Sequence, residues 1–589
     1  MRLSDFRKVW CIDFEFGAGP GDLPEPRCLV AHEFFSGELH RLWLDGGSSH
    51  GPPFFLGGGE LVVAFLASAE FGCFLKLGWP FEGRVLDLFV EFRCLTNGMT
   101  LPAGKGLLGA LTYYGLGHID AVEKESMRGL ALRGGPYSEN EKQQLLDYCQ
   151  SDVDALIALL PEMAPGLDLP RALVRGEYTK AVAWMEHVGI PMDVGMLGRL
   201  DRYWPEIQTR LIKRVDCKYQ VYEGTTFKRD RFTEYLRRQR IPWPLLPSGS
   251  PDMKEATFKM MAKAFPKLAP LWELRKSLGQ MRLKKFTVGS DGRNRGMLSP
   301  FSSKTGRNQP STSKFIFGAS KWMRGLIKPP TGWGLAYIDW AQQEFGIAAA
   351  LSGDSKMMEA YLSGDPYLGF AKLAGAVPQD ATKESHPKER TQYKGTMLAV
   401  QYGMEAQTLS FGLDCPVDEA RHLLRMHRET FRTFWRWSEG CVDYALLHRR
   451  LWTTFGWRLH LGIENNPRSL ANFPMQANGA EMLRLACVYL MKAGIRICAP
   501  VHDALLIEAP LDSLEETVAE ARRLMTKASR VVLEGFELGS DFQLVKPPDR
   551  YCDEDGGREF WNLVVSILEE LEAGVTSAVL QSNLRSIEG

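Results

Sequence analysis

Two aspartates that lie far apart in the sequence could carry out metal-assisted chemistry together. Asp339 follows the apolar stretch 335–338, which predicts a strand that presents a carboxylate at its C-terminal end. Asp503 lies between two apolar runs, which predicts a hairpin whose turn exposes its side chain. Carboxylates brought together in this way could hold two Mg²⁺ ions about 3.5 to 4 Å apart, an arrangement that suits phosphoryl transfer.

A second group of residues has the spacing of one helix face. Arg390, Lys394, Leu398 and Tyr402 are each four residues apart and precede Gly403. This spacing drifts by only ~40° per step on an α-helix, so the four side chains share one face. Two cations followed by an aromatic ring suit a nucleoside triphosphate, with charge for the phosphates and a ring for the base. An ordinary amphipathic helix would show the same spacing, so this pattern alone leaves both interpretations open.

Acidic residues near the N-terminus form a third group. Asp13 and Glu15 lie two residues apart in the strand predicted for residues 9–16, so they face the same side of it. Tyr148 and Asp152 are four residues apart in a predicted helix and therefore share a face. Together these side chains could hold a metal pair and orient an attacking water molecule.

The order of these groups resembles DNA polymerase family A. Residues 339–344 are similar to its motif A, residues 390–403 to its motif B and residues 501–503 to its motif C. The resemblance implies that Asp339 and Asp503 are catalytic metal ligands. It implies a nucleotide site made by Arg390, Lys394, Leu398, Tyr402, Tyr367 and Glu344. Glu344 would be a steric gate that fills the space of a ribose 2′-hydroxyl and so favours deoxynucleotides.

Further positions are similar to the primer-template contacts of that family. They are Thr305, Arg307, Arg458, Arg468, Asn472, Gln476 and His502. A basic cluster with the composition for phosphate contact comprises Arg282, Lys284, Lys285, Arg293 and Arg295, of which Lys284 and Lys285 are expected to bind DNA. A solvated surface would have the same composition, so the cluster alone does not distinguish a phosphate-binding site from an ordinary surface.

Three positions depart from the family pattern. Ala504 stands where an acid often follows the motif C aspartate, and the two-metal core does not require that acid. Leu398 replaces a common aromatic residue one turn after Lys394. Tyr367, in Asp365-Pro366-Tyr367, replaces a histidine, so it can hydrogen-bond a phosphate but cannot carry an imidazolium charge.

The N-terminal acids are similar to the DEDDy class of 3′ to 5′ exonucleases, which proofread by two-metal hydrolysis. The resemblance implies that Asp13, Glu15 and Asp152 bind metal and that Tyr148 takes part in catalysis. Its middle motif, usually Asn-x3-Asp, is here Ala-Ser-Ala-Glu-Phe-Gly. The third acid is therefore assigned to Glu70, with Asp87 as the alternative.

The sequence predicts an α/β multidomain fold. A chain of 589 residues is too long for one core, because single cores stop growing at about 250 to 300 residues. The resemblance implies an RNase H-like exonuclease domain followed by a palm, fingers and thumb. The expected ranges are 1–165 for the exonuclease, 171–300 for a helical thumb, 301–353 and 438–548 for the palm, 354–437 for the fingers, and 549–589 for an extension of unknown role.

The composition indicates the compartment in which the protein is expected and how it could bind phosphate. The eleven cysteines include no C-x-x-C pair, which fits a reducing compartment. No run of about 18 apolar residues occurs, so we expect a soluble protein. We also expect it to be a monomer in the cytoplasm of a bacterial or phage-infected cell. The 71 basic and 71 acidic residues cancel, so phosphate binding would depend on local clusters.

The most consistent hypothesis is a DNA polymerase with proofreading, in a compact layout similar to phage-type enzymes. Expected ligands are primer-template DNA, dNTPs, a single-stranded 3′ end in the exonuclease site, and two Mg²⁺ ions per site, or Mn²⁺ in their place. The alternatives are a polymerase with an inactive or weak exonuclease, a single-subunit RNA polymerase, and an accessory replication protein with an inactive palm. The sequence leaves any processivity factor open.

Overall fold

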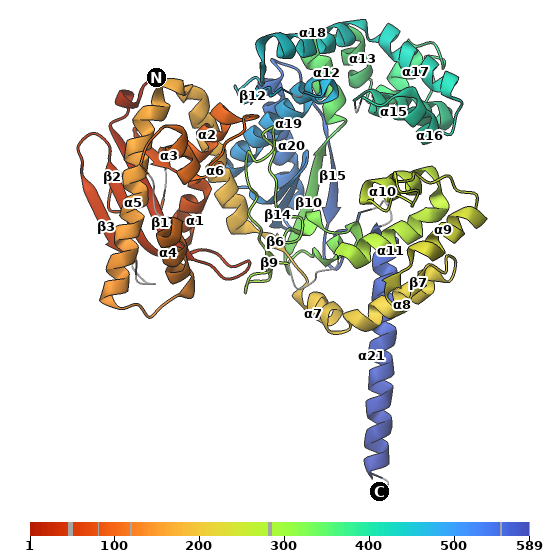
Figure 1. The fold of residues 1–589 in the computed structure, drawn as a ribbon, viewed down its shortest axis with the longest axis horizontal. Coiled ribbons are helices and arrows are strands. Elements are labelled where there is room, and N and C mark those ends of the chain that lie inside the picture. The colour runs from red at the N-terminus through yellow and green to blue at the C-terminus, as the bar shows by residue number, and fades with distance from the viewer. Residues whose placement is uncertain are drawn as a thin grey trace.

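The computed structural model describes residues 1–44, 51–80, 82–117, 121–280, 286–401, 403–463, 465–553 and 557–587. An N-terminal α/β domain lies on one side of the molecule and a larger part with two helical projections lies on the other (Figure 1). Helix α6 (Leu169–Val188) runs between them, packing on the first domain and on the sheet of the second part. No helix among the described residues is long and apolar enough to cross a bilayer.

The N-terminal domain is built on a five-stranded sheet of order β3-β2-β1-β4-β5. The pairs β1–β2 and β2–β3 are antiparallel, and β1–β4 and β4–β5 are parallel. The strands are β1 (Lys8–Gly17), β2 (Glu25–Glu33), β3 (Leu39–Trp43), β4 (Glu60–Ala64) and β5 (Arg84–Asp87). Its helices are α1 (Ala67–Leu77), α2 (Leu88–Thr96), α3 (Leu107–Tyr113), α4 (Ala121–Arg133) and α5 (Glu139–Met163), with short 3₁₀ turns η1 (Leu3–Asp5) and η2 (Ala164–Gly166).

Alternation along β1 explains why this strand is central. Val9 and Cys11 belong to one buried cluster, whereas Trp10, Ile12 and Phe14 belong to another on the opposite face. Both faces are therefore covered, the first by α5 and the second by α1. Asp13 and Glu15 continue the face of Val9 and Cys11, so the alternation that builds the core also carries the two acids toward α5.

The segment expected to begin the thumb differs from the prediction. Residues 171–188 belong to α6, which packs against α1 and β5 and against the second sheet, and not against the thumb helices. Its contact with β5 is close: a Cβ at Gly176 would lie 2.0 Å from the Val85 carbonyl oxygen. Long apolar helices look alike in sequence, and only packing reveals that this one joins two parts of the molecule.

The helical projection that follows α6 is formed after a short strand, β6 (Ile190–Pro191), which pairs with β9 (Arg293–Asn294). Its elements are α7 (Val194–Arg202), α8 (Trp204–Asp216), β7 (Tyr222–Glu223), β8 (Thr226–Phe227), α9 (Arg229–Arg238), α10 (Glu255–Ala264), η3 (Pro266–Leu268) and α11 (Ala269–Gln280). The turn η3 separates α10 from α11, because Pro266 starts a new turn.

The second sheet has the order β13-β14-β10-β15, and all its pairs are antiparallel. Its strands are β10 (Trp333–Trp340), β13 (Arg496–Val501), β14 (Ala504–Pro510) and β15 (Ser540–Val545). Helices α19 (Pro467–Lys492) and α20 (Leu514–Val532) pack on it and on each other. The strand predicted near residue 339 and the hairpin predicted around Asp503 are both present.

The second helical projection covers the range expected for the fingers. Its helices are α12 (Gln343–Ser352), α13 (Ser355–Leu362), α14 (Pro366–Leu373), α15 (Pro387–Gln401), α16 (Ala406–Leu413), α17 (Val417–Thr430) and α18 (Arg432–His448). Helix α17 ends at Thr430, and α18 begins two residues later. A two-stranded hairpin, β11 (Arg450–Trp452) and β12 (Arg458–His460), then returns the chain toward the N-terminal domain.

The C-terminal helix α21 (Gly557–Ile587) starts against the second part and then extends away from the molecule (Figure 1). It packs on α8 and on the 3₁₀ helix η6 (Lys321–Leu326), which follows η5 (Ile316–Gly318). Ion pairs join Arg199 to Glu572 at 2.6 Å and Arg214 to Glu570 at 2.5 Å. The extension therefore joins the first helical projection to the sheet-bearing part.

Candidate active sites

Strand pairing brings Asp339 and Asp503 to the same edge of the second sheet. Asp339 on β10 lies opposite Ala504 of β14, so Asp503 is the next residue, in the two-residue turn between β13 and β14. The turn is completed by His502, whose φ of 59° lies in the left-handed region. On the other side of β10, Asp339 lies opposite Asp541 of β15. The sequence interpretation did not include Asp541.

The pKa shifts of these carboxylates reflect their burial and their closeness to one another. The pKa of Asp339 is raised to about 7 by burial first and then by the charges of Asp503 and Asp541. Burial also raises the pKa of Asp503, while the Arg307 charge opposes that shift. Within the described part of the chain, the buried Oδ1 atom of Asp339 has no hydrogen-bond partner. A divalent cation fits such a site, since it would supply the missing partner and relieve the repulsion.

Glu344 lies near this acidic edge. It is in the first turn of α12, and its Oε1 is 3.8 Å from Nη2 of Arg307. Burial raises the pKa of Glu344, and the Arg307 charge partly opposes the rise. Two residues that the sequence assigned to different roles, sugar discrimination and DNA contact, therefore form an ion pair.

Helix α15 brings the predicted triphosphate residues together. The ring of Tyr367, on α14, is 5.5 Å from the Arg390 guanidinium carbon and 5.6 Å from the Lys394 ammonium nitrogen. Arg390 is also hydrogen-bonded to Asp365, which caps α14. Tyr367 thus contacts both cations, which defines its position more closely than the sequence did. Leu398 is partly buried on the same helix, and Tyr402 lies outside the described residues.

The predicted primer-template residues lie on several elements. Arg468, Asn472 and Gln476 recur every four residues on α19, so they share a face. Arg468 is paired with Glu405 at 2.5 Å. Thr305 lies in a loop where its hydroxyl contacts Ser303, and Arg458 starts β12.

The prediction of a basic phosphate-binding cluster was wrong for Arg293 and Arg295. Arg293 forms an ion pair with the buried Glu508 at 2.8 Å and donates to the Val188 carbonyl oxygen at 2.9 Å. Arg295 pairs with Asp291 and donates to backbone oxygens of α6. Both guanidinium groups are used in holding elements together. Lys284 and Lys285 lie outside the described residues.

In the N-terminal domain, Asp13, Glu15 and Asp152 offer ligand atoms that all lie within 4.8 Å of one another. Burial raises the pKa of Asp13, and the neighbouring charges of Asp152 and Glu15 raise it further. Tyr148 donates its hydroxyl to Oδ2 of Asp152 at 3.1 Å. These three acids, which the sequence predicted to be metal ligands, lie close enough together to hold one ion, and their chemistry fits a hard divalent cation.

Glu70 is close to this group but is used differently. Its Oε2 accepts a hydrogen bond from the Phe14 backbone N–H at 2.8 Å, and it is almost fully buried on α1. Burial raises its pKa, with a further contribution from the charge of Asp13. The alternative acid, Asp87, was a wrong choice: it caps α2 and accepts hydrogen bonds from Leu66 and Ala67. Its carboxylate is occupied by backbone N–H groups.

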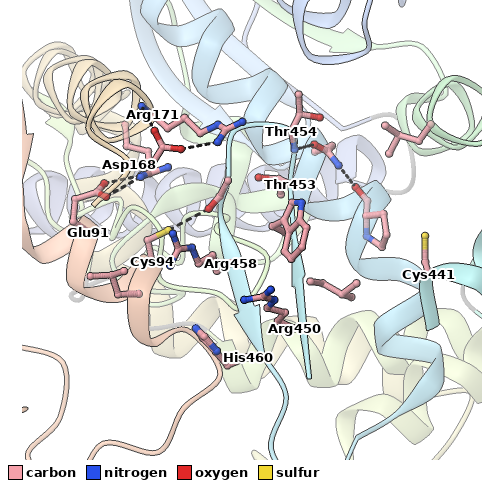
Figure 2. Close-up of a pocket in the computed structure, with 18 of the residues that line it drawn as sticks. Glu91, Cys94, Asp168, Arg171, Cys441, Arg450, Thr453, Thr454, Arg458 and His460 are labelled. Carbon is pink, nitrogen blue, oxygen red and sulfur yellow. Dashed lines mark hydrogen bonds and ion pairs between the residues drawn. The ribbon is translucent and has the colours of Figure 1, made fainter. Parts of the chain in front are cut away.

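A pocket of about 660 Å³ lies where the two parts of the molecule meet (Figure 2). Glu91 and Cys94 of α2 line one side, and Arg450 and Arg458 of the β11–β12 hairpin line the other. Glu91 is engaged in a buried ion pair with Arg175, 2.6 Å long.

Comparison with known proteins agrees with this arrangement. The family model described as DNA polymerase family A matches residues 311–539, which contain β10 with Asp339 and the β13–β14 hairpin with Asp503 in its turn. Residues 311–539 of the chain are similar to DNA polymerase family A. The thermostable DNA polymerase I of Thermus caldophilus is 31% identical over 220 residues, which are 35% of this chain and 26% of that protein. DNA polymerase I of Aquifex aeolicus is 24% identical over 387 residues, which are 62% of this chain and 65% of that protein.

The match therefore spans about a quarter of the length of the Thermus family A polymerase and about two thirds of the Aquifex one. Among solved structures, the POL domain of Pol1 from M. smegmatis, in complex with DNA primer-template and dNTP, has a TM-score of 0.69 at 19% identity. That likeness covers 92% of this chain and 95% of the other. It confirms the predicted α/β multidomain fold.

Proposed function

We propose that this chain is a template-directed DNA polymerase that adds dNTPs to a primer 3′ end. The observation that carries the proposal is the placement of Asp339 and Asp503 side by side at one sheet edge, with an unpartnered oxygen on Asp339. Support comes from the family match over this region and from the printed description of the M. smegmatis structure, which holds primer-template DNA and dNTP.

Different residues of the chain would carry out separate parts of nucleotide addition. Asp339 and Asp503 would hold Mg²⁺, which supplies charge for the attacking 3′-hydroxyl and the leaving pyrophosphate when bound. Arg390 and Lys394 present two cations for the triphosphate, and Asp365 and the Tyr367 ring hold their side chains in place. Glu344, held near Arg307, occupies space beside the acidic edge and would exclude a ribose 2′-hydroxyl.

Primer extension by an Asp503→Ala variant tests the proposal. The substitution removes a metal ligand but no phosphate contact, so we expect extension to fall by roughly a thousandfold or more, since a bound cation contributes several kcal/mol to transition-state stabilisation. Binding of labelled primer-template, measured by fluorescence anisotropy, should stay within about twofold of the wild-type value. Asp512→Ala, an exposed aspartate after β14, is the matched control. Extension by Asp503→Ala at the wild-type rate would refute the proposal.

We further propose that the N-terminal domain is a 3′ to 5′ exonuclease. The close group of Asp13, Glu15 and Asp152, with Tyr148 donating to Asp152, supports hydrolysis of a single-stranded 3′ end. Tyr148 is placed to orient a water molecule, because its hydroxyl lies beside the acids. Glu70 would fix the backbone of β1 through Phe14.

Degradation of a labelled, mismatched 3′ end without dNTPs tests the second activity. Asp13→Ala should abolish degradation and leave extension of a matched primer unchanged. Wild-type protein that shows no degradation would refute the exonuclease proposal and leave the polymerase proposal standing. Incorporation assays with rNTPs in place of dNTPs separate the polymerase from an RNA polymerase.

A further inference from the structure

Helix α2 of the N-terminal domain reaches across to a loop of the larger part. Arg93 donates from Nε to the Phe301 carbonyl oxygen at 2.9 Å and from Nη2 to the Ser302 carbonyl oxygen at 2.7 Å. The loop they belong to, residues 301–307, contains Thr305 and Arg307, two of the predicted DNA contacts. A residue of the N-terminal domain therefore binds the backbone of a loop that belongs to the polymerase site.

Asn97, the residue that ends α2, holds two segments at once. Its Nδ2 donates to the Lys304 carbonyl oxygen at 2.7 Å and to the Arg458 carbonyl oxygen at 2.6 Å. Asn97 is 4% exposed, so losing both bonds would leave its buried amide nitrogen without these two acceptors. Its own carbonyl oxygen accepts a hydrogen bond from the His460 backbone N–H at 2.8 Å. The amide therefore links the loop to the β11–β12 hairpin.

The approach of the two parts is close along this seam. Gly98 has a φ of +90°, and a Cβ there would lie 2.1 Å from the His460 carbonyl oxygen. Only a residue without a side chain allows the hairpin to come so near. Figure 2 shows the same seam, with Cys94 of α2 directed at the hairpin and Arg458 beside it.

The loop needs such support because its conformation is unfavourable on its own. Phe301 has a φ of +56°, which L-residues with large side chains seldom adopt. Farther along the loop, Arg484 donates to the Gly306 carbonyl oxygen at 2.7 Å, and the Arg307 side chain then lies 3.8 Å from Glu344. A path of direct contacts thus runs from α2 through the loop to Glu344, the proposed sugar gate.

The geometry points to Arg93 and Asn97 as positioning residues for nucleotide addition. They lie in the domain proposed to remove nucleotides, but their side chains fix the loop that presents Thr305 and Arg307 to primer-template DNA. The inference rests on the proposed polymerase function. A contact elsewhere between the two parts provides a comparison, because it does not touch this loop: Asp22 accepts a hydrogen bond from the Ser290 backbone N–H at 2.7 Å.

The test compares full-length variants of these residues. Asn97→Asp keeps the size of the side chain but sets an oxygen against the two carbonyl oxygens that Nδ2 now binds. Arg93→Met keeps the aliphatic stem and removes both donors, whereas Arg93→Lys keeps one charged donor. Asp22→Ala is the matched control for an interdomain contact away from the loop. For each variant, primer-template Kd, kcat and KM for dNTPs, and the thermal unfolding midpoint are measured.

We expect Asn97→Asp and Arg93→Met to raise the primer-template Kd roughly tenfold. Arg93→Met loses two hydrogen bonds to the loop, and Asn97→Asp loses one to the loop and one to the hairpin. Their preference for dCTP over CTP should also fall, because Arg307 no longer holds Glu344. Arg93→Lys should recover part of the affinity, and Asp22→Ala should match the wild type. The inference would be overturned if primer-template affinity fell in every variant, the control included, in proportion to the fall in the unfolding midpoint. It would also be overturned if Asn97→Asp and Arg93→Met kept the wild-type Kd and sugar preference. Wild-type protein that does not extend a primer would refute the proposed function instead.

Discussion

Replacing Asp339 by Asn should abolish primer extension and, in the absence of metal, stabilise the protein. Asparagine has the size of aspartate but no charge, so it removes the repulsion from Asp503 and Asp541 together with one metal ligand. In buffer with EDTA at high pH, the folded wild type holds a charged, partly buried Asp339, which lowers its stability. The variant has no charge at this position and avoids that loss.

The size and sign of the effect follow from the pKa of Asp339. Its rise from a usual value of 3.8 to about 7 corresponds to about 4 kcal/mol of destabilisation when the group is ionised, at about 1.4 kcal/mol per pH unit. Because the carboxylate is partly exposed, solvent screening lowers this to about 1 to 2 kcal/mol. A group whose pKa is higher in the folded state loses stability as pH rises. The wild type should therefore lose stability between about pH 4 and pH 7, and the variant should not.

Thermal unfolding in EDTA at pH 5 and pH 8 measures this difference. The advantage of Asp339→Asn over the wild type should be clear at pH 8 and much smaller at pH 5. Adding Mg²⁺ at pH 8 should stabilise the wild type more than the variant, because ligands that bind only the folded state raise its stability. Asp512→Asn serves as the control at an exposed position. If Asp339→Asn were less stable than the wild type at pH 8 in EDTA, the charge of Asp339 would not be destabilised by burial and by its acidic neighbours, and the reasoning would be refuted.

Three other substitutions give separate outcomes. Glu344→Ala should raise ribonucleotide incorporation roughly tenfold or more, measured as the ratio of kcat/KM for CTP and dCTP, and no rise would remove the gate assignment. Lys394→Ala should raise the KM for dNTPs roughly tenfold or more through loss of a charged phosphate contact, whereas the exposed Lys388→Ala on the same helix should not; equal effects would contradict a specific role. Glu91→Gln should lower the free energy of unfolding by about 3 kcal/mol in denaturant titrations, because it leaves Arg175 buried with a weaker partner.

Local patterns in the sequence predicted the elements that carry the acids. The apolar run before Asp339 gave β10, and the two runs around Asp503 gave the hairpin of β13 and β14. Period-two alternation placed Asp13 and Glu15 on one face of β1, and their contact with Asp152 follows from the packing of α5 on that face. These predictions succeeded because each rests on neighbours in sequence.

Tertiary partners could not be predicted in the same way. Asp541 was missed because its strand is short and its partner, β10, lies two hundred positions earlier in the chain. Arg293 and Arg295 have the composition of a phosphate site, yet their partners are a buried glutamate and backbone oxygens from distant segments. Asp87 likewise has the residue type of a metal ligand, but it follows β5 directly and caps the next helix. Residue type shows what a side chain can do, and only the fold shows what it contacts.

In both sites, the register of strand pairing decides which face of the sheet the acidic side chains point to. β10 is paired on both sides, so a shift of one residue would break two ladders and turn Asp339 from the acidic edge to the opposite face. In β1, a register shift after Glu15 ends the regular pairing just beyond the second acid. Asp339, Asp13 and Glu15 are thus positioned by the same hydrogen bonds that hold the two sheets. The loop that carries Arg307 has no such ladder, and this is the physical reason why side chains from another domain are needed to hold it.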